Sequence, residues 1–221
     1  MSCWEIRIAT LIGAIVVGLT PPTTTAAEQP GLAIATLETL PVKGRAPKTG
    51  YSRDQFGQAW ADVNRNGCDT RNDILKRDLT AIIYKAGTRN CVVASGTLLD
   101  RYSGETINFI RGNITSMEVQ IDHVVALSNA WQTGAFKLTA DQRKALANDP
   151  MNLFAVKGRL NSQKGDGDAA TWLPPLKSFR CAYVAQQIAV KAKYSLWVVP
   201  PEKAAMLSIL AKCPTQKVPV S

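Results

Sequence analysis

The pattern of apolar and polar residues along the chain has two periods, which predict helices in some segments and strands in others. Phe56, Trp60 and Val63 stand at i, i+4 and i+7, so they predict one face of a helix over 53–67 that ends at an Asn-Gly turn. The same reasoning predicts helices over 70–79, 124–134, 139–149, 178–196 and 201–213.

Two of these helices carry recognisable capping residues at their start. Thr70 is the expected N-cap of the helix over 70–79, because its hydroxyl can accept from a free backbone N–H. Thr139 and Gln142 have the spacing of a capping box, in which each side chain bonds to the backbone of the other residue. Both helices are therefore expected to begin where these residues stand.

Strands are predicted in the middle of the chain, where β-branched and aromatic residues gather between turn signals. Residues 80–100 indicate two strands around a glycine-containing loop, and 101–113 continues the β character. Residues 116–122 alternate between apolar and polar, and 151–156 predict another short strand. The polar, basic segment 157–168 is expected to be a loop or a short helix. A few strands within a mostly helical chain predict an α+β fold.

The start of the chain has the pattern of a secretory signal peptide. An apolar run from 8 to 19 is followed by small and polar residues, with cleavage expected after Ala27. The alternative is an uncleaved anchor, which is disfavoured because a spanning helix needs about 20 apolar residues. We expect residues 1–27 to be a signal peptide, 28–50 to be a flexible tail and 51–221 to be the functional domain, without stable membrane association.

Cysteine content agrees with export. Without Cys3 of the signal peptide, four remain: Cys68, Cys91, Cys181 and Cys213. An even number in an exported chain favours disulfides. Three pairings are possible, and sequence order favours Cys68–Cys91 with Cys181–Cys213. The alternative is a four-thiolate zinc site, which is disfavoured because the chain has no C-x2-C knuckle.

The formal net charge is +9. A positive balance of this size favours an anionic partner such as nucleic acid, an anionic surface or an acidic polymer. Many exported proteins are basic for solubility alone, so charge indicates the class of partner only together with a site.

His123 is the only histidine in the chain, and Asp122 stands directly before it in the segment VQIDHVVALSNAW. A histidine in an apolar segment is more often a packed core residue than a catalyst. At a strand end, however, both side chains can reach one cleft, where a carboxylate is a hard ligand for Mg²⁺ and a histidine is a general base. Asn152 and Asn161 bound the segment NLFAVKGRLN, which SQKGDGD follows.

This ordered set resembles the motif of HNH endonucleases, and it is similar to exported proteins related to the C-terminal domain of GmrSD-type restriction enzymes. The segments NGCDTRNDILKRDL and TWLPP add to the resemblance, which extends from Tyr51 to Cys213. The resemblance implies a ββα-metal finger, a β-hairpin and a helix around one divalent cation, embedded in a mostly helical scaffold. Residues 51–221 would then be an HNH nuclease domain.

The resemblance also implies a role for each matching residue. His123 would be the general base, and Asn152 would accept a hydrogen bond from its other ring nitrogen. Asp122 and Asn161 would hold the cation. Because asparagine stands where many HNH proteins have histidine, Mg²⁺ is expected, or alternatively Mn²⁺, in preference to zinc.

Two basic residues are secondary candidates for binding substrate. Lys164 would contact a flanking phosphate, and its alternative is a solvated loop lysine. Arg71 would reach the scissile phosphate, and its alternative is an ion pair with Asp69 or Asp73. Trp60 is assigned to the core.

These observations predict a metal-dependent endonuclease, secreted or in the cell envelope, that acts on nucleic acid with little sequence specificity and on DNA in preference to RNA. One rival is an exported nucleic-acid-binding protein without catalysis. Another is a cell-envelope protein in which Asp122 and His123 form a buried ion pair. An acyl hydrolase fits poorly, because the chain has no Gly-x-Ser-x-Gly elbow.

Overall fold

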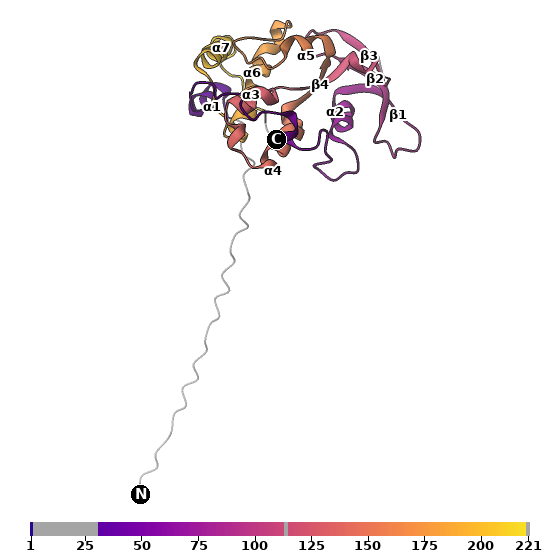
Figure 1. Cartoon of the computed structure of the whole chain (residues 1–221), viewed down its shortest axis with the longest axis horizontal. Coiled ribbons are helices and arrows are strands. Elements are labelled where there is room, and N and C mark those ends of the chain that lie inside the picture. Colours follow the sequence, from indigo (N-terminus) through magenta and orange to yellow (C-terminus); the bar gives the residue numbers. More distant parts are fainter. Residues whose placement is uncertain (2–30, 113–114, 220–221) are drawn as a thin grey trace.

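A computed structural model of the chain describes residues 1, 31–112 and 115–219. Helices gather at one end of the molecule, a three-stranded sheet lies at the other end, and a second pair of strands runs between them (Figure 1). The predicted α+β class is confirmed. Apart from Met1, the predicted signal peptide, residues 1–27, lies outside the described residues. In the part that the structure describes, no helix combines the length and apolar composition needed to cross a membrane.

The three-stranded sheet is antiparallel, in the order β1 (Leu79–Tyr84), β2 (Val93–Leu99) and β3 (Thr106–Ile110). Helix α2 (Thr70–Asp78) leads directly into β1 and contacts β2 and one strand of the second pair, β5 (Leu153–Lys157). The predicted helix over 70–79 is confirmed, but its N-cap is Asp69, whose carboxylate accepts the N–H of the third helical residue. Aspartate is as strong an N-cap as serine and stronger than threonine, which explains the shift by one residue.

The central pair consists of β4 (Val119–His123) and β5 (Leu153–Lys157), which are antiparallel, with His123 opposite Leu153. Helix α5 (Gly158–Lys164) begins immediately after β5 and packs on both strands. Gly158 permits this turn, because a Cβ atom there would lie 1.9 Å from the carbonyl oxygen of Met117. The polar, basic segment 157–168, which the sequence predicted to be either a loop or a short helix, therefore contains the helix α5.

The segment between β4 and β5 is helical and folds back under the pair. It contains α3 (Leu127–Gln132), η3 (Ala135–Lys137), α4 (Ala140–Asn148) and η4 (Pro150–Asn152). The predicted capping box at the start of α4 is confirmed, since the side chains of Thr139 and Gln142 each bond to the backbone of the other residue. Two further single turns are η2 (Thr115–Met117) and η5 (Lys177–Phe179).

The helix predicted over 53–67 is wrong. Only a single turn, η1 (Arg53–Phe56), forms there, and Gly57 and Trp60 both have positive φ angles, 71° and 58°. These angles end any right-handed helix. Val63, the third member of the apolar pattern, is 43% exposed, so the spacing was coincidental.

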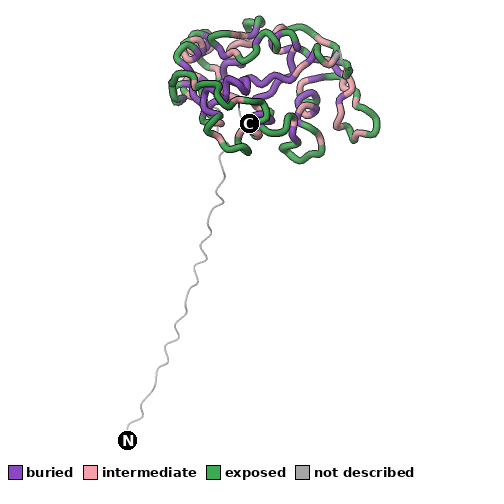
Figure 2. The backbone as a smooth tube through the Cα atoms, in the orientation of Figure 1, coloured by how far each residue is buried: buried purple, intermediate pink, exposed green. Residues whose placement is uncertain are grey.

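The helical end is built from α1 (Ala33–Thr39), α6 (Arg180–Lys193) and α7 (Pro200–Leu210), which contact one another pairwise. The prediction of a flexible tail over 28–50 is wrong for this part of the chain. Leu37 of α1 is fully buried in the core between α6 and α7. Burying a leucine side chain contributes about 1.5–3 kcal/mol, which is enough to dock a short helix. Buried positions concentrate in the middle of the molecule (Figure 2).

Both predicted disulfides are confirmed. Cys68–Cys91 joins the loop before α2 to the turn between β1 and β2, and Cys181–Cys213 joins α6 to the segment after α7. Each one closes a local loop at one end of the molecule. Each end of the molecule is therefore cross-linked by its own disulfide, and the central strands lie between them.

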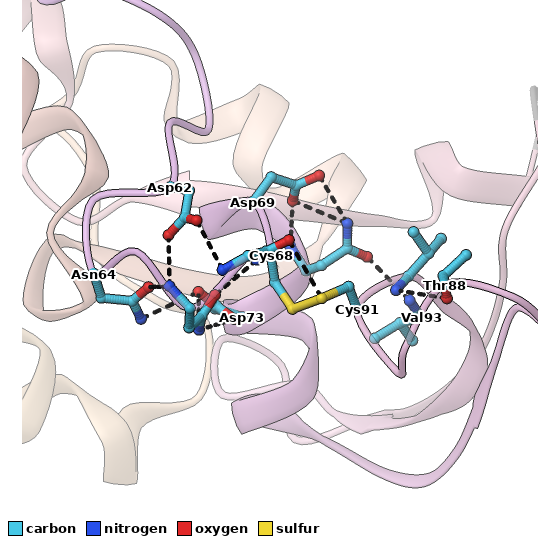
Figure 3. The surroundings of a disulfide bond; sticks show 12 residues. Asp62, Asn64, Cys68, Asp69, Asp73, Thr88, Cys91 and Val93 are labelled. Carbon is cyan, nitrogen blue, oxygen red and sulfur yellow. Dashed lines mark hydrogen bonds between the residues drawn. A yellow bond between two sulfur atoms is a disulfide. The ribbon is translucent and has the colours of Figure 1, made fainter.

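The loop before α2 is held by its own polar side chains as well as by the disulfide (Figure 3). Asp62 accepts hydrogen bonds from the N–H of Asn66 and of the next residue, and Asp73 accepts from the Asn66 amide at 3.0 Å. The spacing D-x-N-x-N-G-x5-D is close to that of calcium-binding loops, but here these oxygens accept hydrogen bonds within the loop. This loop lies between Trp60 and Arg71 in the sequence.

A buried ion pair connects the helices of the helical end. The Lys191 ammonium donates to the carboxylate of Glu202 at 3.0 Å and to the carbonyl oxygen of Trp197 at 3.0 Å, and both charged side chains are 0% exposed. Burial lowers the pKa of Lys191 and raises that of Glu202, while each charge opposes the shift of the other. Removing one partner would leave a charge in the core without compensation.

We predict that Lys191→Met lowers the free energy of unfolding by about 3–5 kcal/mol, because Glu202 loses its partner. Urea denaturation at neutral pH measures this loss. The matched control is Lys203→Met, which removes a partly exposed pair with Glu38 and should cost at most about 1 kcal/mol. Equal losses in the two variants would contradict the structural role of the buried pair.

Candidate active site

His123 ends β4 beside the last turn of α4. Its Nε2 lies 2.9 Å from the carbonyl oxygen of Ala147. A carbonyl only accepts, so Nε2 carries the ring proton and Nδ1 carries the lone pair. Burial lowers the pKa of the ring from 6.5 to about 4, aided by the charges of Arg53 and Lys164 and opposed by the bond to Ala147. His123 is therefore neutral at neutral pH, with a basic nitrogen on Nδ1.

Asn152 does not accept the hydrogen bond from the imidazole that the sequence predicted, because the acceptor is Ala147. Asn152 is fully buried, and its amide oxygen accepts from the N–H of Val125 at 2.8 Å. Its amide nitrogen lies 3.3 Å from the carbonyl oxygen of Leu146, the residue before Ala147. Asn152 thus connects the segment after His123 to the turn that holds the imidazole.

Asp122 has a protein partner on each carboxylate oxygen. Oδ1 accepts from the ammonium of Lys164 at 2.8 Å, and Oδ2 accepts from the Tyr102 hydroxyl at 2.5 Å. The same ammonium also donates to the carbonyl oxygen of His123 at 2.7 Å. Burial and the Asp122 charge raise the pKa of Tyr102 well above its usual range, so it remains a donor. Both oxygens of Asp122 thus take part in a buried hydrogen-bond network.

The prediction that Lys164 contacts a flanking phosphate, or is a solvated loop lysine, requires correction. Its side chain is 0% exposed and lies under β4. The sequence could not reveal this, because Lys164 stands in a run of polar residues. Its position in the last turn of α5, whose length sequence reasoning left open, directs it inward.

A pocket of about 300 Å³ opens beside the Asp-His pair, and we call it the polar pocket. It is lined by Arg53, Trp60, Arg71, Gln120, Ile121, Asp122, His123, Ala126, Leu127, Asn161 and Gly165. The pocket brings together four of the six predicted site residues, while Lys164 and Asn152 lie outside its lining. The Asn161 amide nitrogen donates to Gln120 at 2.9 Å, which holds this asparagine at the wall of the pocket.

Two arginines give the polar pocket its positive charge. The expected alternative for Arg71, an ion pair, is not formed, because Asp69 caps α2 and Asp73 binds asparagine side chains. Burial lowers the pKa of Arg71, and the neighbouring Arg111 adds to this effect. Sequence reasoning missed Arg53, an isolated basic residue at the start of a segment interpreted as a helix. Among the described residues, neither Arg53 nor Arg71 forms an ion pair with a carboxylate.

The lining of the polar pocket fits a magnesium ion better than zinc. In the described part of the chain, no group of three histidine, cysteine or acidic side chains could hold a metal. Mg²⁺ is commonly bound by one or two carboxylates, with water and substrate phosphate as the remaining ligands. Asp122 and Asn161 supply hard oxygens of this kind, and each Asp122 oxygen keeps a second lone pair beside its hydrogen bond.

The site thus combines a neutral imidazole, a buried carboxylate and two arginines in one pocket. The family model described as "GmrSD restriction endonucleases, C-terminal domain" matches residues 69–209. The chain belongs to this family, and the resemblance found in the sequence is confirmed.

One relative was found in the fungus Arthroderma benhamiae (strain ATCC MYA-4681 / CBS 112371), where it is described as "Uncharacterized secreted protein". It is 37% identical over 208 residues, which cover 92% of this chain and 97% of the relative. The similarity therefore extends over nearly the full length of both chains. No solved structure is significantly similar to this chain.

The depressed pKa of His123 predicts a loss of stability in acid. The unfolded ring takes up a proton near pH 6.5, whereas the folded ring does so only near pH 4. The contribution of the neutral His123 ring to the free energy of unfolding is therefore fully present above pH 6.5. It decreases by about 3 kcal/mol as the pH falls to 4. Urea denaturation of the wild type and of His123→Gln across this range tests the prediction. In His123→Gln the free energy of unfolding should fall less between pH 6.5 and 4 than in the wild type. The same dependence on pH in both proteins would contradict the prediction.

The network below β4 predicts strong coupling between Lys164 and Asp122. Lys164→Met should lower the free energy of unfolding by about 3–5 kcal/mol at neutral pH, since it leaves a buried carboxylate without its counter-ion. Adding Asp122→Asn should restore part of this loss, which a double-mutant cycle measures. Lys157→Met, which breaks an exposed pair with Glu105, is the matched control with an expected cost of at most about 1 kcal/mol. Additive losses would exclude the coupling.

Proposed function

We propose that this protein is an exported, metal-dependent HNH endonuclease that hydrolyses phosphodiester bonds of nucleic acid. The observation that carries the proposal is the position of His123 in the polar pocket beside Arg53 and Arg71, with its Nε2 bonded to the Ala147 carbonyl. Its Nε2–H is fixed by Ala147, and burial keeps the ring neutral, so that Nδ1 is a base beside two arginines. The order of β4, β5 and α5 supports the assignment of these elements as the ββα finger.

In this proposal, Nδ1 of His123 takes a proton from the water that attacks phosphorus, and Nε2 donates to Ala147 throughout. Arg53 and Arg71 bind the non-bridging phosphate oxygens, for which guanidinium groups have matching geometry. Asn152 acts by positioning, because it holds the backbone on both sides of the imidazole. Formation of the imidazolium is assisted by the Ala147 carbonyl, which becomes a stronger partner for a charged ring.

Asp122 and Asn161 would hold the divalent cation, Mg²⁺ or alternatively Mn²⁺. When bound, the cation supplies positive charge at the phosphoryl oxygens and at the leaving 3′-oxygen. The ammonium of Lys164 shares Asp122 with it, so part of the carboxylate charge is already neutralised. We therefore expect weak binding of the free ion and tighter binding once a substrate phosphate is present.

The substrate is nucleic acid, with DNA preferred to RNA, and the reaction depends little on sequence. A net charge of +9 and unpaired arginines favour phosphate contacts, which carry no direct sequence information. Two disulfides and the description of the fungal relative as secreted support a location outside the cytoplasm, in the medium or the cell envelope.

The rival is an exported protein that binds nucleic acid without cutting it. One observation favours it: both Asp122 oxygens already have protein partners, as in a purely structural network. The two functions differ in whether product forms when Mg²⁺ is added and whether chelation stops it. Binding without cleavage in either condition would favour the rival.

We expect purified protein to cut DNA in Mg²⁺ and to stop cutting when a chelator is added. His123→Ala should lower kcat by about 10²–10⁴-fold, because it removes the base. The control is Phe136→Ala, which should retain activity. Phe136 is an exposed aromatic residue outside the polar pocket and outside β4, β5 and α5. Circular dichroism verifies that both variants are folded. Full activity in folded His123→Ala would refute the assignment of the base.

A further inference from the structure

A second pocket, of about 220 Å³, lies against His123 next to the polar pocket. We call it the aromatic pocket, and its lining includes Phe56, Trp60, Leu127 and Ala147. It shares Arg53, Trp60, His123 and Leu127 with the polar pocket, so the two pockets adjoin at these residues. Its volume is below the range of about 300–1,000 Å³ that is usual for drug-sized ligands. A single flat ring system matches this size.

Trp60 forms the boundary between the two pockets. Its ring is stacked on that of His123, with centroids 5.9 Å apart and an interplanar angle of 16°. The residue has a φ of 58°, a conformation that a bulky side chain rarely adopts. It is partly buried: it packs against the core cluster that contains Ile74 and Leu75, as the sequence suggested, and the rest of its side chain is accessible. Residues held in such sparsely populated backbone conformations cluster at functional sites.

We propose that the aromatic pocket receives one unpaired nucleobase next to the phosphate that is cut, an inference that rests on the proposed nuclease function. The polar pocket has the charge for the phosphate, and the aromatic pocket has the apolar, flat surface that a base requires. Arg53 lines both and can contact the phosphate while the base lies against Trp60. The occupant is thus the nucleotide that carries the bound phosphate.

This assignment defines the preferred substrate as single-stranded nucleic acid. A base in a duplex is stacked and paired, so it cannot enter a pocket without being extruded at a cost of a few kilocalories per mole. A single strand does not have this cost. The protein should therefore cut single strands, loops and frayed ends faster than the same sequence in a duplex.

The test uses a single-stranded oligodeoxynucleotide in which every linkage but one is a phosphorothioate, so that cleavage is directed to one phosphodiester. The base on either side of this linkage is replaced in turn by an abasic residue. For the wild type, one of the two replacements should lower kcat/KM by about 5- to 150-fold, the range that stacking of one base provides. The other replacement should have a smaller effect, which identifies the side that enters the pocket.

The variants then assign the effect to Trp60. Trp60→Ala should lower kcat/KM on the intact strand by a similar factor and should no longer respond to the abasic residue. Trp60→Phe, which keeps a ring, should respond as the wild type does. Phe136→Ala is the matched control, an exposed aromatic outside both pockets, and it should behave as the wild type. The wild-type experiment needs no variant, so misfolding of Trp60→Ala would not prevent the test.

Binding of the same strands in chelator, where no cleavage occurs, separates this inference from the nuclease proposal. Weaker binding of one abasic strand, without any cleavage in metal, would refute the nuclease and retain the base pocket. Cleavage that is equally fast on intact and abasic strands, or equally fast on single strands and duplexes, would overturn the base pocket and leave the nuclease standing.

Discussion

The arrangement of the site depends on one buried ammonium group. Lys164, at the end of α5, donates both to the Asp122 side chain and to the backbone of His123. These two acceptors lie on consecutive residues of β4, so a single charge fixes the strand end, the helix end and the carboxylate relative to one another. In a low-dielectric interior such charge-assisted bonds are strong, and no water competes for them.

A second consequence of this network is electrostatic. With Asp122 paired to Lys164, the acid next to His123 contributes little negative charge to the imidazole. Burial then acts on the ring without opposition from a free carboxylate, which keeps the pKa low. The pocket instead has the field of Arg53 and Arg71, which is suited to an anion. The lone pair on Nδ1 of His123 and the charges of Arg53 and Arg71 can therefore occupy one pocket. Burial, and not a nearby carboxylate, determines the protonation of the imidazole.

Sequence reasoning succeeded where the signal was local. The capping box of α4 depends on two residues three positions apart, and the disulfides join cysteines that are neighbours in the sequence order. The Asp-His pair and Asn161 were found through a motif, and the structure places them in one pocket. The helical periodicity around Trp60 was misleading, because Gly57 turns the chain before the pattern can form a face.

Sequence reasoning failed where the interaction partner of a residue was a backbone atom or lay far away along the chain. The acceptor for His123 is a main-chain carbonyl, which has no side-chain identity, so the sequence suggested an asparagine amide for the same task. Arg53 reaches the pocket only because η1 packs on α4, a contact between distant segments. The burial of Lys164 likewise results from how α5 meets β4. None of these contacts has a periodic or compositional signature.

The bond between Cys68 and Cys91 ties down the loop that lies between Trp60 and Arg71. Reducing compartments keep thiols separate, whereas oxidising ones join them. Before oxidation, hydrogen bonds alone hold this loop, among them the exposed ones of Asp62 and Asn66 and the buried one from the Thr70 hydroxyl to the carbonyl oxygen of Ala61. If the chain is exported and acts as the proposed nuclease, this wall of the pocket is held less firmly before the disulfide forms. Oxidation outside the cell would then complete the wall, which separates the maturation of the site from the cell's own nucleic acid.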